Sequence, residues 1–237
     1  MTRFPSTEQW SALEGSVRAL APEVRRAVAE GWAFAAQQEH ASIASFSKFA
    51  LELLAVGAPP SLLVSAHRAG LDEIDHARMS FKVASICTGQ PLGPGPLPIS
   101  AQSITQSLSL QASAVAAALD GCLNEAIAAL EAGAAADATN HEALKLVLEE
   151  IARDEQNHAE LAWEYVAWAI ATGGGSVRDA IKTAAERAMT ELEAEPAPAL
   201  GAAPNGWGIL EPRTRHELRV RSSREVLRPA FARLVEG

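Results

Sequence analysis

Long stretches in which apolar residues recur every three or four positions alternate along this chain with short stretches rich in proline and glycine. A spacing of three and four residues places side chains on one face of an α-helix. The pattern therefore predicts four long helices, at about residues 22–57, 61–87, 103–136 and 140–171. Each helix would carry one apolar stripe, and Ser61 would cap the second helix.

The breaks between these stretches predict how the helices are connected. A short Gly-Ala-Pro-Pro turn at residues 57–60 makes the first two helices antiparallel neighbours. Residues 89–98 are rich in proline and glycine and cannot be helical. An extended chain gains about 3.1 Å per residue, so this linker can span the length of a helix of roughly 23 residues. The second and third helices are therefore expected to run in parallel.

Beyond the glycine run at residues 173–175, we expect one further helix to about residue 195 and a basic helical segment at residues 213–234. This segment is interpreted either as a lid, a partner-docking element or a wall of a substrate passage, or as a helix that simply packs on the surface. The prediction is an all-α chain. A four-helix bundle with a short N-terminal helix occupies residues 1–175, and a C-terminal helical extension, residues 176–237, packs on it.

Composition narrows the class of protein. The chain has 237 residues, of which 48% are hydrophobic and 5% aromatic, which suits closely packed helices with a substantial core. Its formal net charge is -9, and it has no dense basic run before its final segment, so a nucleic-acid partner is not expected.

The location of the chain is predicted from what its sequence lacks. Cys87 and Cys122 are too few for a disulfide scaffold, and the first nine residues do not resemble a signal peptide. No run of about eighteen apolar residues is free of polar breaks, so we expect no membrane span. These features predict a cytoplasmic protein.

Six metal-ligating side chains fall on the predicted apolar stripes. Two Glu-x-x-His tetrads occupy residues 73–76 and 155–158, and a lone glutamate precedes each of them on the preceding helix. The six side chains are those of Glu39, Glu73, His76, Glu125, Glu155 and His158. Isolated tetrads of this kind are common as surface ion pairs, but two of them with two matching glutamates on apolar stripes indicate a buried site.

The spacing explains what such a site would bind. A glutamate and a histidine three residues apart project from the same helix face and offer one metal a carboxylate and an imidazole. Two such helices side by side hold two metals, and Glu39 and Glu125 complete the set by bridging or capping the ions. Four carboxylates and two neutral imidazoles carry a charge of about -4, which two divalent ions neutralise.

Two aspartates flank the tetrads. Asp72 and Asp154 each precede a motif glutamate, where they can accept the outer N–H of a ligating histidine from the opposite helix. Alternatively, they are ordinary solvent-facing charges. Oxygen-rich ligands with one imidazole per metal suit iron first, or manganese or a mixed iron and manganese pair, rather than zinc.

Over residues 22–171 this arrangement resembles the ferritin-like di-metal carboxylate superfamily. The resemblance implies a ferritin-like four-helix bundle with a long crossover between its second and third helices. It also implies that the six motif residues are the metal ligands and catalytic residues, with Asp72 and Asp154 supporting the histidines.

The resemblance leaves the reaction open. The leading hypothesis is an oxidoreductase that uses two iron ions, O2 and an external electron donor to hydroxylate, N-oxygenate, desaturate or cleave a small organic molecule, as a monomer or homodimer. One alternative is a bacterioferritin-like ferroxidase and iron store, but some sixty residues follow Gly173, which such a cage would have to accommodate. Another is a non-catalytic, metal-stabilised bundle. Tyr165 is the sole tyrosine and lies seven residues beyond His158, which disfavours radical generation.

Small residues near the ligands have two interpretations. They leave room for an organic substrate, or they let the helices approach closely. The residues concerned are Ala35, Ala36, Ser42, Ala69, Gly70, Ser80, Gly121, Ala128, Ala129 and Ala162.

Overall fold

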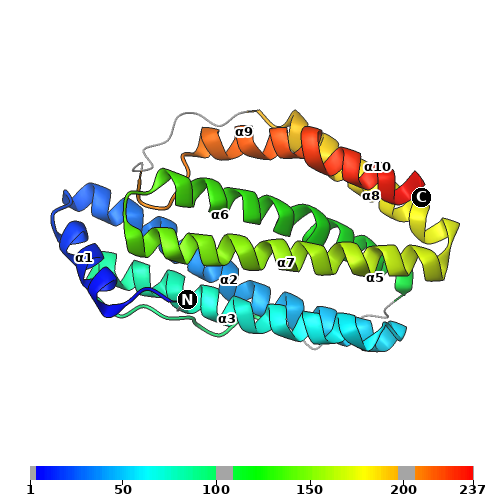
Figure 1. The fold of residues 1–237 in the computed structure, drawn as a ribbon, viewed down its shortest axis with the longest axis horizontal. Coiled ribbons are helices and arrows are strands. Elements are labelled where there is room, and N and C mark those ends of the chain that lie inside the picture. Colours follow the sequence, from blue (N-terminus) through cyan, green and yellow to red (C-terminus); the bar gives the residue numbers. More distant parts are fainter. Residues whose placement is uncertain (1–3, 100–108, 197–205, 237) are drawn as a thin grey trace.

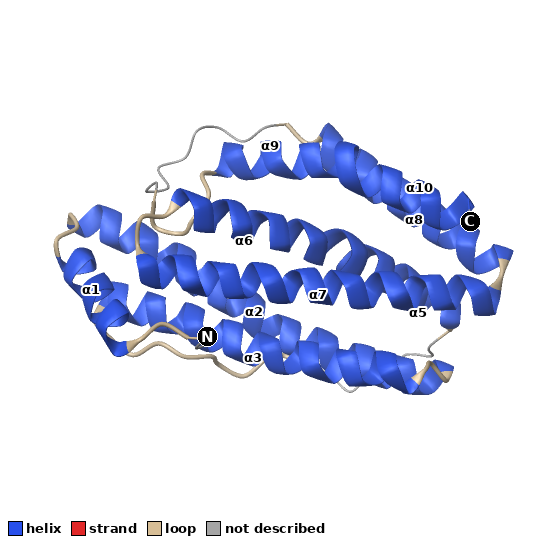
Figure 2. Cartoon of the chain, viewed as in Figure 1, coloured by secondary structure: helices blue, strands red, loops and turns tan. Residues whose placement is uncertain are grey.

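The structure is a computed structural model that describes residues 4–99, 109–196 and 206–236. Within these residues all regular secondary structure is helical, as predicted (Figure 2). Four long helical segments lie side by side (Figure 1). They are α2 (Pro22–Val56), α3 (Pro60–Thr88), the segment made of α5 (Leu110–Ala117), η1 (Ala118–Glu125) and α6 (Ala126–Ala138), and α7 (Glu142–Gly173).

The glycine breaks end the helices where the sequence predicts. Gly57 and Gly89 follow α2 and α3 in the left-handed conformation, with φ of 68° and 71°, which costs glycine little. The prediction that Ser61 caps α3 is wrong, because that helix begins at Pro60 and has no side-chain cap. Proline suits the first position of a helix, because the backbone N–H that it lacks would have no partner within the helix there.

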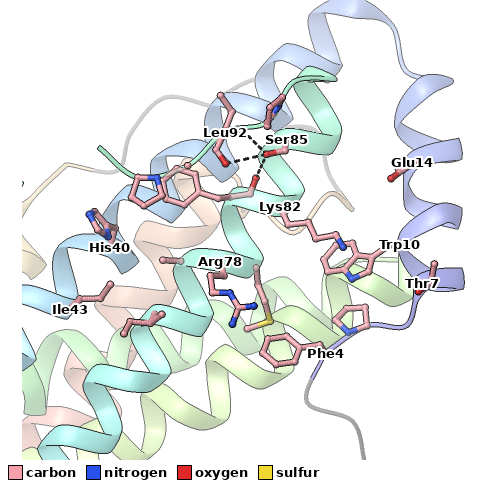
Figure 3. A pocket seen from close by; sticks show the side chains of 18 of the residues that line it. Phe4, Thr7, Trp10, Glu14, His40, Ile43, Arg78, Lys82, Ser85 and Leu92 are labelled. Atoms are coloured by element: carbon pink, nitrogen blue, oxygen red, sulfur yellow. Dashed lines mark hydrogen bonds between the residues drawn. The ribbon is translucent and has the colours of Figure 1, made fainter. Parts of the chain in front are cut away.

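The proline-rich linker lies along the outside of α2 and α3. The Ser85 hydroxyl accepts a hydrogen bond from the Leu92 N–H at 2.9 Å, and His40 Nε2 hydrogen-bonds the Gly95 carbonyl at 3.2 Å (Figure 3). The α5 helix starts at the opposite end of the molecule from the end of α3, so the two run in the same direction, as predicted (Figure 1). Residues 103–108 of the expected third helix lie outside the described residues.

The third long segment is not one uniform α-helix, contrary to our expectation. Its middle section, η1, is a π-helix of eight residues that ends at Glu125. A π-helical turn holds more than four residues, so it shifts the register of all that follows, and such turns are frequent at functional sites. The periodicity of the sequence does not reveal the change, because the residues around it are mostly small and apolar.

Two large apolar clusters lie on either side of a polar layer, and Ala36, Ala77 and Phe81 form a third, small one. One large cluster includes Phe46, Leu161 and Tyr165, and the other includes Trp32, Val83 and Leu144. Along α2, α3 and α7 the predicted metal-ligating residues fall between the stretches that supply the two clusters. The fold therefore places its most polar buried groups midway along the long helices.

Further helices pack around the four long segments (Figure 1). Trp10, Leu13 and Val17 of α1 (Thr7–Arg18) join one apolar cluster. The C-terminal extension consists of α8 (Gly175–Ala194), α9 (Pro212–Ser222), η2 (Ser223–Leu227) and α10 (Arg228–Glu236). Ile181 and Phe231 of this extension are buried in the other cluster, so the extension packs on the long helices (Figure 1).

Among the described residues, one helical stretch, Leu110–Ala138, is long and apolar enough to cross a membrane by length and composition alone. The core helix of a soluble protein passes the same test. This stretch carries Glu125 and packs against α7 and α8 inside the molecule.

Candidate metal centre

The six metal-ligating residues predicted from the sequence come together in the polar layer. Neighbouring helices contribute them: one from α2, two from α3, one from η1 and two from α7. Their ligand atoms form two overlapping groups, in each of which all atoms lie within 4.8 Å of one another. The groups are Glu39, Glu73, His76 and Glu155, and Glu73, Glu125, Glu155 and His158.

Both imidazoles present their Nδ1 atoms to the carboxylates. His76 Nδ1 lies 3.6 Å from Glu39, 3.8 Å from Glu73 and 3.5 Å from Glu155. His158 Nδ1 lies 3.3 Å from Glu73 and 3.2 Å from Glu155. Two atoms that each bind one ion at about 2.1 Å are separated by roughly 3 to 4 Å. The observed separations therefore fit ligands that converge on common ions.

Glu73 and Glu155, which we call the shared carboxylates, each face both histidines. Glu73 directs Oε2 toward His76 and Oε1 toward His158. Glu155 directs Oε1 toward His76 and Oε2 toward His158. One oxygen per histidine is the arrangement of a carboxylate that bridges two ions.

The sequence left open whether Glu39 and Glu125 bridge or cap the metals. In the structure each of them belongs to one group only, whereas the shared carboxylates belong to both. If two ions bind, Glu39 and Glu125 would therefore be terminal ligands, and the glutamates of the two tetrads would bridge.

The flanking aspartates reach across to the opposite helix, as predicted. Asp154 of α7 lies 3.2 Å from Nε2 of His76 on α3, and Asp72 of α3 lies 3.5 Å from Nε2 of His158 on α7. A carboxylate that accepts the Nε2–H leaves Nδ1 free of its proton, which is the form that binds a metal. The alternative interpretation, solvent-facing charge, does not hold for Asp154, because this residue is 4% exposed.

Several atoms of this layer are buried with no hydrogen-bond partner, including both carboxylate oxygens of Glu73 and Nδ1 of His76. Orphaned polar atoms in a protein core are rare and costly. Here they face one another across distances that suit metal coordination, and their combined charge suits two divalent cations. The residues present therefore fit a two-metal centre.

Without metal, the carboxyl groups take up protons to different extents. Burial raises the pKa of Glu39 to about 7, and the nearby shared carboxylates push it the same way. Burial also raises the pKa of Glu125 well above its usual value, assisted by a hydrogen bond with Glu155. Burial would raise the pKa of Glu155 too. The interactions of Glu155 with Glu125 and the two histidines outweigh this effect, so the pKa is lowered.

The imidazoles are strong proton acceptors in the same state. Burial alone would lower the pKa of His158, but the nearby carboxylates of Asp72, Glu155 and Glu73 raise it to about 11. The pKa of His76 is raised in the same way, chiefly through Asp154 and Glu155, against the opposing effect of burial. Protons on the two rings thus offset part of the negative charge that metal ions would neutralise.

Two cavities reach the six-residue cluster from different sides. One, of about 110 Å³, touches Glu125 and His158 and is bounded by Phe46, whose ring meets the His158 ring edge-on at 4.8 Å. The other, of about 430 Å³, touches Glu39 and Glu155. A larger cavity, of about 1030 Å³, lies between α1, the outer face of α3 and the linker (Figure 3). It touches none of the six residues.

Ser80 is the one polar neighbour whose importance the sequence did not show. Its hydroxyl is fully buried, has no hydrogen-bond partner and lines the 430 Å³ cavity beside Glu39 and Glu155. Its place one turn beyond His76 on the inner stripe was visible, but a serine at such a position normally bonds back to its own helix.

Comparison with protein-family models, with curated proteins and with solved structures gives no match for this chain. The chemistry of the cluster is therefore inferred from its residues and their geometry.

Replacing the shared carboxylates tests the metal centre. We expect protein purified from iron-supplemented cells to hold about two metal ions per chain, and the double variant Glu73→Gln, Glu155→Gln to lose most of both, because each carboxylate serves both ions. Elemental analysis measures the content. The double variant Glu160→Gln, Glu164→Gln removes two exposed charges from α7 and should keep the metal. Equal metal content in both variants would contradict the assignment.

The protonation pattern predicts how metal binding depends on pH. Metal ions can bind only after protons have left Glu39, Glu125 and both histidines. The pKa of Glu39 is about 7. Metal affinity should therefore increase as the pH rises from about 6 to 8, the range around the pKa of Glu39. Calorimetry in buffers of different ionisation enthalpy should show protons released on metal binding, and a heat independent of the buffer would refute this.

Proposed function

We propose that this protein is a ferritin-like diiron oxidoreductase that uses O2 to oxidise a small organic molecule. The observation that carries the proposal is the pair of shared carboxylates, each with one oxygen toward each of two buried histidines. Together with a four-helix bundle whose second and third helices are joined by a crossover, this ligand set supports membership in the ferritin-like class.

The donor set favours iron. Each ion would receive one imidazole and three carboxylates, of which two are shared. Hard oxygen donors suit iron or manganese, whereas structural zinc sites prefer cysteine and histidine. Glu39, Glu73, Glu125 and Glu155 would hold the two ions close together, and such a pair would bind and activate one small molecule.

When bound, two ferrous ions supply electrons that reduce O2. Insertion of one oxygen atom into a C–H bond consumes the substrate, O2, two electrons and two protons, and yields the hydroxylated product and water. The two electrons come from an external donor, which is why we expect a reductase or ferredoxin-like partner. We also retain the expectation of a cytoplasmic monomer or homodimer.

The protein residues hold the reacting groups in place and keep bulk water away. Asp72 and Asp154 fix the orientation and protonation of the two imidazoles. Phe46 packs against the His158 ring and closes the small cavity on that side. Both histidines are at most 2% exposed, so a reactive oxidant formed here would be shielded from solvent.

Two other functions receive less support. Tyr165 is fully buried, pairs with Ser113 and packs against Phe49 and Trp168, which is the environment of a core residue rather than a radical site. Iron storage requires a cage of many chains, which would have to accommodate the C-terminal extension of each chain. The 430 Å³ cavity beside Glu39 favours an organic substrate, because ligand pockets commonly have volumes of this size.

The reaction with oxygen distinguishes these functions. Anaerobic protein loaded with about two ferrous ions per chain should consume roughly one O2 per pair of ions, since one O2 accepts the two electrons that the pair releases. An oxygen electrode measures the uptake, and the Glu73→Gln, Glu155→Gln variant serves as the inactive control. If the protein instead oxidises and retains a large excess of ferrous ion over this ratio, it is an iron store. No oxygen uptake at all would refute catalysis.

A further inference from the structure

The 430 Å³ cavity, here called the strap cavity, joins the metal centre to the C-terminal extension. Its walls come from α2, α3, α6 and α7 on one side, and from residues 208–210 and α9 on the other. We call residues 206–210 the strap. At its inner end the cavity touches Glu39, Glu155 and Ser80, and at its other end it touches Arg215 and Arg219. The extension thus contributes directly to the surroundings of the site.

The strap is held tightly against α2. The Trp32 indole donates a hydrogen bond to the Trp207 carbonyl at 2.9 Å, and the Thr139 hydroxyl donates one to the Gly206 carbonyl at 2.6 Å. A Cβ atom at Gly31 would lie 2.3 Å from Ile209, and Gly208 adopts a φ of +75° against the Trp32 ring. The positive φ of Gly208 favours glycine at that position, and a side chain at Gly31 would displace the end of the Ile209 side chain.

The middle of the cavity is apolar. Trp32, Leu148 and Ile209 provide large surfaces, and the alanines at 35, 128 and 132 leave space between them. Charged or strongly hydrated molecules would lose their hydration in this region without compensation. The body of a ligand bound here must therefore be apolar.

The end formed by α9 carries a net positive charge. Arg215 and Arg219 both face Glu131, with Arg215 Nε 3.4 Å from its carboxylate and Arg219 in closer contact. Two guanidinium groups thus face one carboxylate, and the side chains of Arg215 and Arg219 are 40% and 42% exposed. Arg215 Nε is buried and makes no hydrogen bond. An anionic group at this position would satisfy it.

We infer that the strap cavity binds an organic carboxylate, with its carboxylate on Arg215 and Arg219 and its apolar body directed toward Glu39 and Ser80. Guanidinium groups match the geometry of a carboxylate. The unpartnered Ser80 hydroxyl offers one hydrogen bond at the inner end, beside the ligands of one metal. This inference rests on the proposed function, because it identifies the substrate class of that metal centre.

The test measures binding of hexanoate, with hexanamide and hexylammonium as neutral and cationic controls, by calorimetry on the purified protein. Hexanoate should bind saturably and at least tenfold more tightly than either control. The variant Arg215→Gln, Arg219→Gln should weaken it about 10- to 100-fold, as expected for the loss of hydrogen bonds from charged groups. The matched variant Arg213→Gln, Arg221→Gln changes two exposed arginines of the same helix and should bind normally.

A second variant blocks the cavity without altering its charge. Ala128→Phe, which adds a ring to the wall on α6, should also weaken hexanoate binding at least tenfold while its circular dichroism and melting temperature show that it folds. Equal binding of hexanoate and hexanamide, equal loss in both arginine variants, or no saturable binding of hexanoate would overturn the inference.

Measuring the metal content of the wild-type protein and of each variant distinguishes failure of this inference from failure of the proposed function. Two bound metals and oxygen uptake without carboxylate binding would refute the strap cavity and leave the oxidoreductase intact. Carboxylate binding that depends on Arg215 and Arg219 in a chain that takes up no metal would refute the oxidoreductase and leave the binding site intact.

Discussion

The structure depends on how two buried carboxylates, two partly buried ones and two buried imidazoles are electrically compensated. A charge transferred into a protein core costs several kcal/mol unless an opposite charge or a set of hydrogen bonds replaces its water. Here six such groups share one layer, and Asp72 and Asp154 add two more carboxylates at its edge. Two divalent cations would neutralise the charge of the six ligand groups. Without the cations, protons on the carboxyl groups and imidazole rings compensate this charge only in part.

This layer organises the helices around it. Most buried apolar residues belong to two large clusters, which hold the long helices together on either side of the polar groups. The small residues of the sequence serve both purposes that were considered for them. A Cβ atom at Gly121 would lie 2.2 Å from that of Ala162, so η1 and α7 meet closely there. Ala35 and Ala128 instead leave space in the strap cavity.

Much of the architecture follows from local rules that a sequence displays directly. Spacings of three and four residues, helix-ending glycines and a proline-rich crossover predict the long helices and their directions. The six clustered residues were predicted because each lies on an apolar stripe. What could not be predicted depends on contacts between distant segments. That Glu73 and Glu155 each face both histidines appears only when α3 and α7 are placed side by side. The register change in η1 has no clear signature in an alanine-rich stretch.

The position of the C-terminal extension also could not be predicted, because its contacts involve residues far apart in the chain, such as Trp32 with Trp207 and Glu131 with Arg219. Anomalous diffraction from crystals of the iron-loaded protein tests the central claim most directly. The account predicts two peaks about 3.5 to 4 Å apart, both in contact with Glu73 and Glu155, one beside His76 and the other beside His158. A single peak, or metal bound away from these carboxylates, would contradict it.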